Sequence, residues 1–272
     1  MTKKVATIFF AMAILAIAGF ENQTFAQFNQ KPKKKVPEFK QYAWTGSMDK
    51  HKIPVFIWLE ENADGILAGE IVYTGSTSKT PIRIMGRAIQ YPESDHVTYS
   101  LAEFWGKKGQ QTGYMSFAID SVGKASGTWH FFERDLDLVL DSVVPFPAGK
   151  GGLLRPLTQQ QIGGKKRTYE YFYRHPYKSQ LGGTVIIEQI EHKYLRFDIS
   201  VNDPNIAEGN NFADYNRTIL NGNRFEYIMR ECNYGFDAVI FEDFMVITSK
   251  SNEPSDCFGF GSSFEGIYLE QK

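Results

Sequence analysis

Short segments in which apolar and polar residues alternate, separated by turn residues, run along most of this sequence. The clearest covers 194–201, where Leu195, Phe197 and Ile199 share one face with Val201, while polar residues take the other. A period of two places alternate side chains on opposite faces of a β-strand, so each such segment predicts a half-buried strand. No helix-length amphipathic stretch interrupts 41–144. The pattern therefore predicts an all-β protein.

A first β module is predicted over 41–144. Aromatic residues make up 15% of the chain and 24 residues are Gly, which favours strands joined by tight turns. Asn62-Ala63-Asp64-Gly65 predicts a hairpin turn. The predicted strands are Gln41–Met48, Ile53–Glu60, Ile66–Thr74, Thr80–Arg87, His96–Phe104, Thr112–Ile119, Ala125–Phe132 and Leu136–Ser142.

A second β module is predicted over 167–272. Asn221-Gly222 predicts a tight hairpin turn, and Glu242-Asp243 predicts another between strands at 238–241 and 244–248. The polar, Gly- and Asn-rich segment 203–214 is predicted to be a long loop.

The Gly- and Pro-rich segment 145–166 predicts a linker between the modules. The expected architecture is two compact antiparallel β-barrels or β-sandwiches joined by this linker. Gly127-Thr128-Trp129 and Gly266-Ile267-Tyr268 both place an aromatic residue two positions after a glycine. Gene duplication and chance each explain this similarity between the two segments.

The first 26 residues predict a secretion signal. Lys3 and Lys4 precede an uncharged, mostly apolar run over 5–20, and Thr24-Phe25-Ala26 fits a cleavage site. An uncleaved anchor is the alternative, although the run is shorter than a membrane span needs. The basic, proline-broken segment 27–40 predicts an exposed tether. We therefore expect a periplasmic or secreted protein with no transmembrane segment in the mature chain.

Two cysteines, Cys232 and Cys257, are the only ones in the chain. In an exported protein an isolated pair predicts a structural disulfide. A zinc site would need more ligands than the pair supplies. The 30 basic and 31 acidic residues are balanced, so no long-range attraction to nucleic acid is expected.

Signatures of catalysis are missing from the sequence. It contains no Gly-x-Ser-x-Gly or His-Glu-x-x-His motif, and its histidines are scattered. No cofactor or metal site is predicted. The acidic residues Glu133, Asp135, Asp137 and Asp141 have the oxygen ligands that calcium prefers. Leucines alternate with them, however, which favours the solvated face of a strand.

Glu103 is the strongest candidate for a ligand contact. It continues the alternation of Val97, Tyr99 and Leu101, which places it on their inward face. A buried carboxylate needs a partner, and Arg83 or Arg87 on an earlier strand is expected to supply it. A ligand anchor at a barrel mouth and a structural ion pair at a barrel end are both consistent with this pairing, and the ion pair is favoured.

Trp105 is the best candidate for an exposed aromatic residue. The four tryptophans, Trp44, Trp58, Trp105 and Trp129, all fall in the first module, and large aromatic side chains usually fill the core. Trp105 precedes the polar turn Gly106-Lys107-Lys108-Gly109, so we expect it at the surface. An exposed indole ring can stack on a sugar or anchor a protein partner.

The end of the chain resembles small exported bacterial β-domains that have been loosely compared with lysozyme inhibitors. The residues that carry the resemblance are Cys232, Phe241, Phe244, 255–261 and Gly266-Ile267-Tyr268. The Ser-Gly-x-x-Tyr signature of one inhibitor family is absent, so no inhibitory residue is carried over.

The favoured function is an exported, non-enzymatic binding protein. Its expected partner is an envelope protein, a glycan or a small apolar ligand held in a barrel mouth. One alternative is a hydrolase that uses paired carboxylates, such as Glu188 with Glu191 or Asp198. The other alternative is a purely structural component of the envelope.

Overall fold

A computed structural model describes most of the chain after residue 38. The described residues are 39–91, 96–106, 110–131, 134–173, 181–191, 193–202, 210–229, 234–250 and 265–272. Residues 38–272 belong to one compact unit, and all the structure described below lies within it. The predicted secretion signal, both cysteines and residues 255–261 lie outside the described residues.

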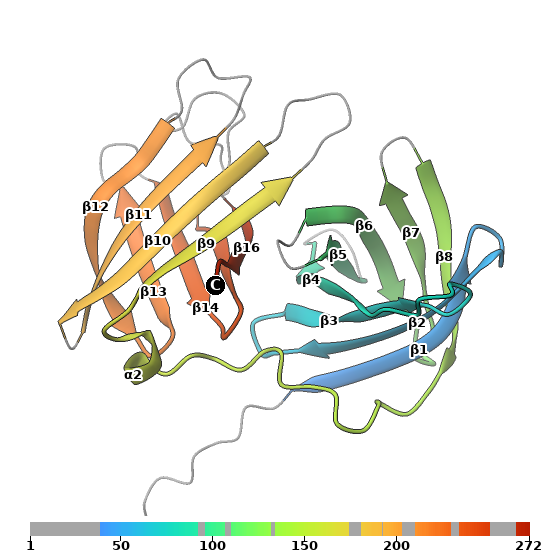
Figure 1. Ribbon diagram of the computed structural model, residues 1–272. Coiled ribbons are helices and arrows are strands. Elements are labelled where there is room, and N and C mark those ends of the chain that lie inside the picture. The colour runs from blue at the N-terminus through green and yellow to red at the C-terminus, as the bar shows by residue number, and fades with distance from the viewer. Residues whose placement is uncertain are drawn as a thin grey trace, which may run out of the picture. The chain divides into compact units, whose positions relative to one another are not determined.

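Eight antiparallel strands form a first closed barrel (Figure 1). Each strand pairs with the next along the chain, and β1 pairs with β8 to close the ring. The strands are β1 (Lys40–Met48), β2 (Ile53–Glu61), β3 (Ile66–Tyr73), β4 (Ile82–Gln90), β5 (Val97–Trp105), β6 (Gln110–Ile119), β7 (Ala125–Phe131) and β8 (Arg134–Val143). The all-β prediction is confirmed, and the barrel replaces the sandwich alternative.

The interior of the first barrel follows the period-two pattern of the sequence. Inward residues such as Ile57, Leu101 and Leu138 are fully buried and form one apolar cluster with Trp44 and Phe117. An eight-stranded barrel is narrow enough for side chains to fill it. Asp135, Asp137 and Asp141 lie on exposed positions of β8, as the solvated-face interpretation predicts.

The turn at 62–65 joins β2 to β3 as predicted. The Asn62 Oδ1 atom accepts hydrogen bonds from the backbone N–H groups of Asp64 at 3.0 Å and Ile66 at 2.9 Å. Gly65 has φ +70°, a left-handed conformation that glycine adopts without steric cost.

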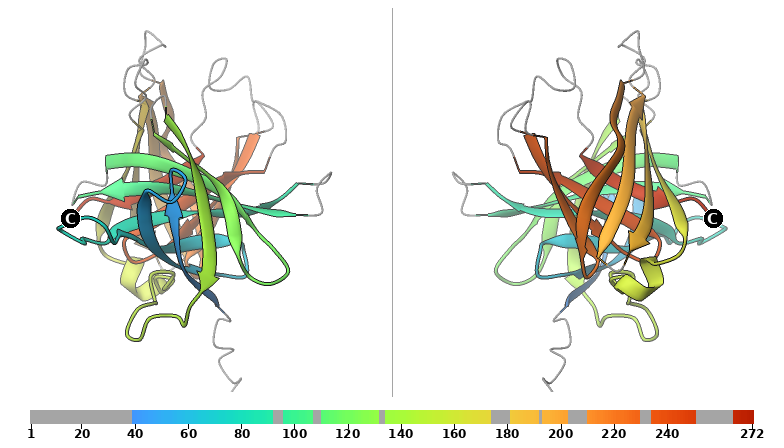
Figure 2. Two further views of the ribbon diagram at one scale, coloured as in Figure 1. Left: turned by 90° about the vertical axis from the view of Figure 1, so that its right-hand side faces the viewer. Right: turned by 90° about the vertical axis from the view of Figure 1, so that its left-hand side faces the viewer.

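A second closed barrel contains the remaining eight strands. Each of its strands also pairs with the next along the chain, and β16 pairs with β9 to close the ring; Figure 2 shows the wrapped strands from two further directions. The strands are β9 (Lys166–Tyr173), β10 (Leu181–Glu191), β11 (Tyr194–Asn202), β12 (Asn210–Asn221), β13 (Arg224–Met229), β14 (Tyr234–Ile240), β15 (Phe244–Ser249) and β16 (Gly266–Glu270).

One predicted loop in the second module is wrong in part. The segment 203–214 was expected to be irregular, but β12 begins at Asn210, where Asn210 and Asn211 pair with Val201 and Ser200 of β11. Backbone hydrogen bonds between strands do not require apolar side chains, so a polar composition did not prevent pairing here.

The linker between the barrels is anchored to the first barrel by a buried carboxylate. Glu60 lies on the outer face of β2 and is 2% exposed. Its Oε2 atom accepts hydrogen bonds from the backbone N–H groups of Gly152 at 2.6 Å and Leu153 at 3.1 Å. Charge-assisted bonds of this kind fix the path of a Gly-rich segment that would otherwise be flexible.

A short helix, α2 (Gln159–Ile162), lies within the segment predicted as a linker and was not predicted. Thr158 and Gln161 form a capping box, in which each side chain accepts a hydrogen bond from the other residue's backbone N–H. Leu157 and Ile162, on either side of this box, are buried in the core of the second barrel.

A third apolar cluster contains outward-facing residues of both barrels. Ile66, Met85 and Phe104 of the first barrel pack in one cluster with residues of β14, β15 and β16. The second barrel supplies Val239, Phe241, Phe244, Val246, Ile267 and Leu269. Among the described residues, no helix is both long enough and apolar enough to cross a membrane.

Candidate binding cleft

Two of the predicted ligand contacts, Arg83 and Trp105, lie in the same cavity, of about 810 Å³. We call it the Trp105 cleft. It is lined by Glu70, Thr80, Pro81, Ile82, Arg83, Phe104, Trp105, Gly106, Asp243, Leu269, Glu270, Gln271 and Lys272. Trp105 is 47% exposed, so a large part of its indole ring is open to a ligand. The antiparallel pairing of β4 with β5 brings Arg83 opposite Phe104, beside Trp105.

Asp243 joins the two cations of the cleft. Its Oδ1 atom lies 2.6 Å from Lys272 Nζ, and its Oδ2 atom lies 3.5 Å from Arg83 Nη2. The hydrogen bond to Asp243 is the main reason why the pKa of Lys272 is raised. Because all three side chains are partly exposed, their polar atoms keep capacity for further hydrogen bonds.

The other two carboxylates of the cleft are also paired. Glu70 accepts hydrogen bonds from Lys150 Nζ at 2.7 Å and Trp58 Nε1 at 3.1 Å. Glu270 accepts a hydrogen bond from Arg167 Nη1 at 2.5 Å. The charges around the cleft are therefore close to balanced, and its walls combine aromatic surface with hydrogen-bonding groups.

Glu103 is buried inside the first barrel, away from the cleft, and is 3% exposed. The inward orientation agrees with the sequence pattern, but the predicted pairing with Arg83 or Arg87 is wrong. Its partners are the hydroxyls of Tyr73 at 2.6 Å and Thr112 at 2.8 Å. On β4 the inward residues are Ile82 and Ile84, so alternation places both arginines on the outer face.

Arg87 does not line the cleft. It lies further along the outer face of β4, opposite Ile66 of β3 and Ser100 of β5. Arg83 forms its ion pair with Asp243 of the second barrel instead of Glu103. Of the four predicted ligand contacts, the fold thus brings together two.

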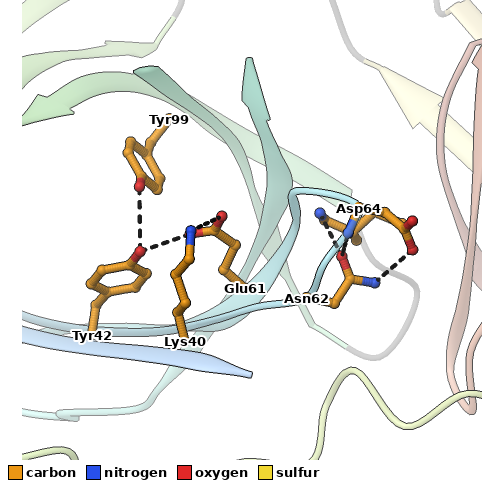
Figure 3. Close-up of polar contacts among 7 residues, drawn as sticks. Lys40, Tyr42, Glu61, Asn62, Asp64 and Tyr99 are labelled. Atoms are coloured by element: carbon orange, nitrogen blue, oxygen red, sulfur yellow. Dashed lines mark hydrogen bonds and ion pairs between the residues drawn. The ribbon is translucent and has the colours of Figure 1, made fainter. Parts of the chain in front are cut away.

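A second inward carboxylate, Glu61, was missed by the sequence reasoning. Figure 3 shows Glu61 beside Lys40 and Tyr42, with the Tyr99 hydroxyl nearby; Lys40 Nζ lies 2.9 Å and the Tyr42 hydroxyl 2.7 Å from its carboxylate oxygens. The bond to Glu61 raises the pKa of Lys40, whereas burial raises the pKa of Tyr42. Glu61 continues the inward series Val55, Ile57 and Leu59, so the alternation that identified Glu103 would also have identified it.

The carboxylates of the hydrolase alternative lie on the outer face of the second barrel. Glu188 is opposite Arg196, and its side chain lies 3.9 Å from that arginine. Glu191 is exposed and pairs with Arg217 at 3.3 Å. Asp198 alternates with the buried Phe197 and Ile199 and so also faces outward. The arrangement does not place these carboxylates on the inner face of the barrel.

Three further charged residues of the cleft, Asp243, Glu270 and Lys272, were not singled out as ligand contacts by sequence reasoning. They come from the second barrel. No local sequence pattern predicts that Asp243 contacts Arg83, which lies 160 positions earlier in the chain. No group of acidic, His or Cys side chains suited to hold a metal ion occurs among the described residues.

No protein-family model and no curated protein matches the chain. A solved structure from Nostoc punctiforme PCC 73102, described as a protein of unknown function from the DUF3598 family, is similar over 85% of this chain and 93% of its own. The two share 11% sequence identity with a TM-score of 0.22.

Proposed function

We propose that this chain is an exported, non-enzymatic binding protein, and that the Trp105 cleft binds a glycan. The observation that carries the proposal is the position of a half-exposed indole ring beside the linked side chains of Arg83, Asp243 and Lys272. The C–H face of a sugar ring can pack on an indole, while its hydroxyls need donors and acceptors within reach.

The balance of charge favours a glycan over a small ion or a purely apolar ligand. The cleft is lined by two basic and three acidic side chains. All three carboxylates also have basic partners. A site of this kind has no strong net charge to attract a simple ion, and its polar walls are unsuited to a ligand that makes no hydrogen bonds.

The test is a binding screen with Trp105→Ala. Neutral cello-, chito-, malto- and manno-oligosaccharides are titrated into the purified protein by isothermal titration calorimetry. We expect at least one series to bind, and Trp105→Ala to weaken it about tenfold or more, which corresponds to about 1.4 kcal/mol.

The matched control is Tyr91→Ala, because Tyr91 is a similarly exposed aromatic residue, at 50%, that does not line the cleft. It should leave the affinity unchanged. If no oligosaccharide binds, or if Trp105→Ala binds as tightly as Tyr91→Ala, the proposal fails.

A further inference from the structure

A second cavity, of about 490 Å³, lies where α2 meets the start of β9. We call it the basic pocket. Its lining includes Gln160, Lys165, Lys166, Arg167, Glu242 and Lys272. The pocket shares Glu270 and Lys272 with the Trp105 cleft, so the two cavities adjoin along the end of the chain that follows β16.

The two cavities differ in charge. Four basic and two acidic side chains line the basic pocket, whereas acidic side chains are in the majority in the Trp105 cleft. Arg167 is paired with Glu270, and Lys272 is paired with Asp243. Lys165 and Lys166 form no ion pair with any residue that the structure describes, and both are exposed. Glu242 and Glu270 are the two acidic residues of the pocket.

Arg167 presents a buried donor in this pocket. Its Nη1 donates to Glu270 at 2.5 Å and its Nη2 donates to the carbonyl oxygen of Gln161 at 3.0 Å. Its Nε–H is buried and has no acceptor at standard hydrogen-bond geometry among the described residues, and the buried Tyr169 hydroxyl interacts with the same side chain. A buried donor without an acceptor is unfavourable and calls for a specific explanation. An anionic oxygen entering from the pocket would accept this bond.

We infer that the glycan bound in the Trp105 cleft carries a negatively charged group, which the basic pocket binds through Lys165, Lys166 and Arg167. The inference rests on the proposed function, because it assigns the second cavity to the same ligand. The common chemistry is an anionic oxygen, from either a uronate carboxylate or a phosphoryl substituent. Both form charge-assisted hydrogen bonds with guanidinium and ammonium groups.

The experiment titrates glucuronate, inorganic phosphate and neutral glucose separately into the isotope-labelled full chain. The NMR signal of the Arg167 Nε–H reports whether the donor gains an acceptor, and Arg167→Lys identifies that signal by its loss. We expect the anions to shift the signal and glucose to leave it in place. A larger response to glucuronate assigns a uronate, and a larger response to phosphate assigns a phosphoryl group.

The variant for this test is Lys165→Gln/Lys166→Gln, which removes the two unpaired charges and keeps side chains of similar length. Its matched control is Lys50→Gln/Lys124→Gln, because those lysines are exposed on turns of the first barrel. We expect anion affinity to fall at least about threefold in the first variant alone. If no anion shifts the Arg167 signal, or if both variants bind anions equally, the inference is overturned.

The two proposals fail in different ways. Oligosaccharide binding that depends on Trp105, without any anion response, overturns the inference and keeps the proposed function. An anion response without oligosaccharide binding that depends on Trp105 overturns the proposed function, and with it the assignment of both cavities to one ligand.

Discussion

At the scale of single residues, two inward carboxylates of the first barrel are each held by a tyrosine. Tyr42 donates to Glu61 and Tyr73 donates to Glu103. A carboxylate inside a barrel is costly unless it is hydrogen-bonded, and a phenol is a donor whose ring can itself fill apolar space. The two ends of the barrel interior thus use the same pairing of residue types.

The buried tyrosines of both barrels predict a loss of stability at alkaline pH. Burial raises the pKa of Tyr42, Tyr73, Tyr169 and Tyr268 above the ordinary value of 10.0, and the negative charge of Glu103 adds to the effect at Tyr73. Because the folded pKa lies above the unfolded one, the stabilisation is complete below pH 10 and is lost as the pH rises from there toward the folded values.

Spectrophotometric titration of tyrosinate, combined with circular dichroism, tests this. We expect part of the tyrosinate absorbance to appear together with unfolding, whereas protein in denaturant titrates in one step near the ordinary pKa. Full titration of all tyrosines near pH 10 in a protein that stays folded would contradict the prediction.

The sequence predicted the inward position of Glu103 but could not predict its partners. Alternation along one strand is a local property, so it shows which face a residue occupies. The partner depends on register across strands, and the pairing of β5 with β6 shifts between Glu103 and Phe104, leaving Thr112 out of the regular pairing. An irregularity of this kind redirects a side chain without a clear signal in the sequence.

At the scale of elements, glycines allow the strands of the first barrel to coil tightly. At Gly86 of β4, a Cβ atom would lie 1.8 Å from the carbonyl oxygen of Ser100 and 2.7 Å from Leu101 Cα, both on β5. No side chain fits at such distances, so backbone of the neighbouring strand occupies the place of a side chain.

Gly86→Ala is therefore expected to destabilise the protein by about 1–3 kcal/mol or more, because the β4 and β5 backbones must move apart. The control is Gly182→Ala in β10, where a Cβ would meet its nearest atom, the Tyr171 carbonyl oxygen, at an ordinary 3.4 Å. Urea denaturation monitored by circular dichroism measures both variants. Equal midpoints for the two would contradict this account of the coiling.

Most strands of the first barrel were predictable because each has one buried and one solvated face. The short helix α2 was not, since four residues are too few to show a helical period. Its sequence signal was the capping box of Thr158 and Gln161. At Asn210 the start of a strand was missed. Polar residues were taken as evidence for a loop where the backbone in fact pairs with β11.

At the scale of the whole molecule, the cluster shared by the barrels explains why some strands lack alternation. Phe244, Met245, Val246 and Ile247 of β15 are all buried, because one face lies in the second barrel and the other in the shared cluster. A continuous apolar strand signals burial on both faces, but it does not reveal what covers the outer one. The position of the cleft beside this cluster therefore needed the tertiary structure.

The shared cluster predicts that the two barrels unfold together. Phe244 stacks on Phe241 with ring centroids 4.6 Å apart, and both belong to the cluster that includes Phe104 of the first barrel. Removing the ring in Phe244→Ala should cost about 3–5 kcal/mol, and part of that loss should fall on the first barrel.

The tryptophans make this coupling measurable, because all four lie in the first barrel and Phe244 lies in the second. In thermal unfolding we expect the tryptophan fluorescence transition to shift downward in Phe244→Ala, together with the far-ultraviolet circular dichroism. Val122→Ala, at a side chain that is 70% exposed, is the control and should shift neither. A fluorescence transition that stays at its wild-type temperature while the dichroism transition falls would mean that the barrels fold independently, since two-state unfolding requires different probes to coincide.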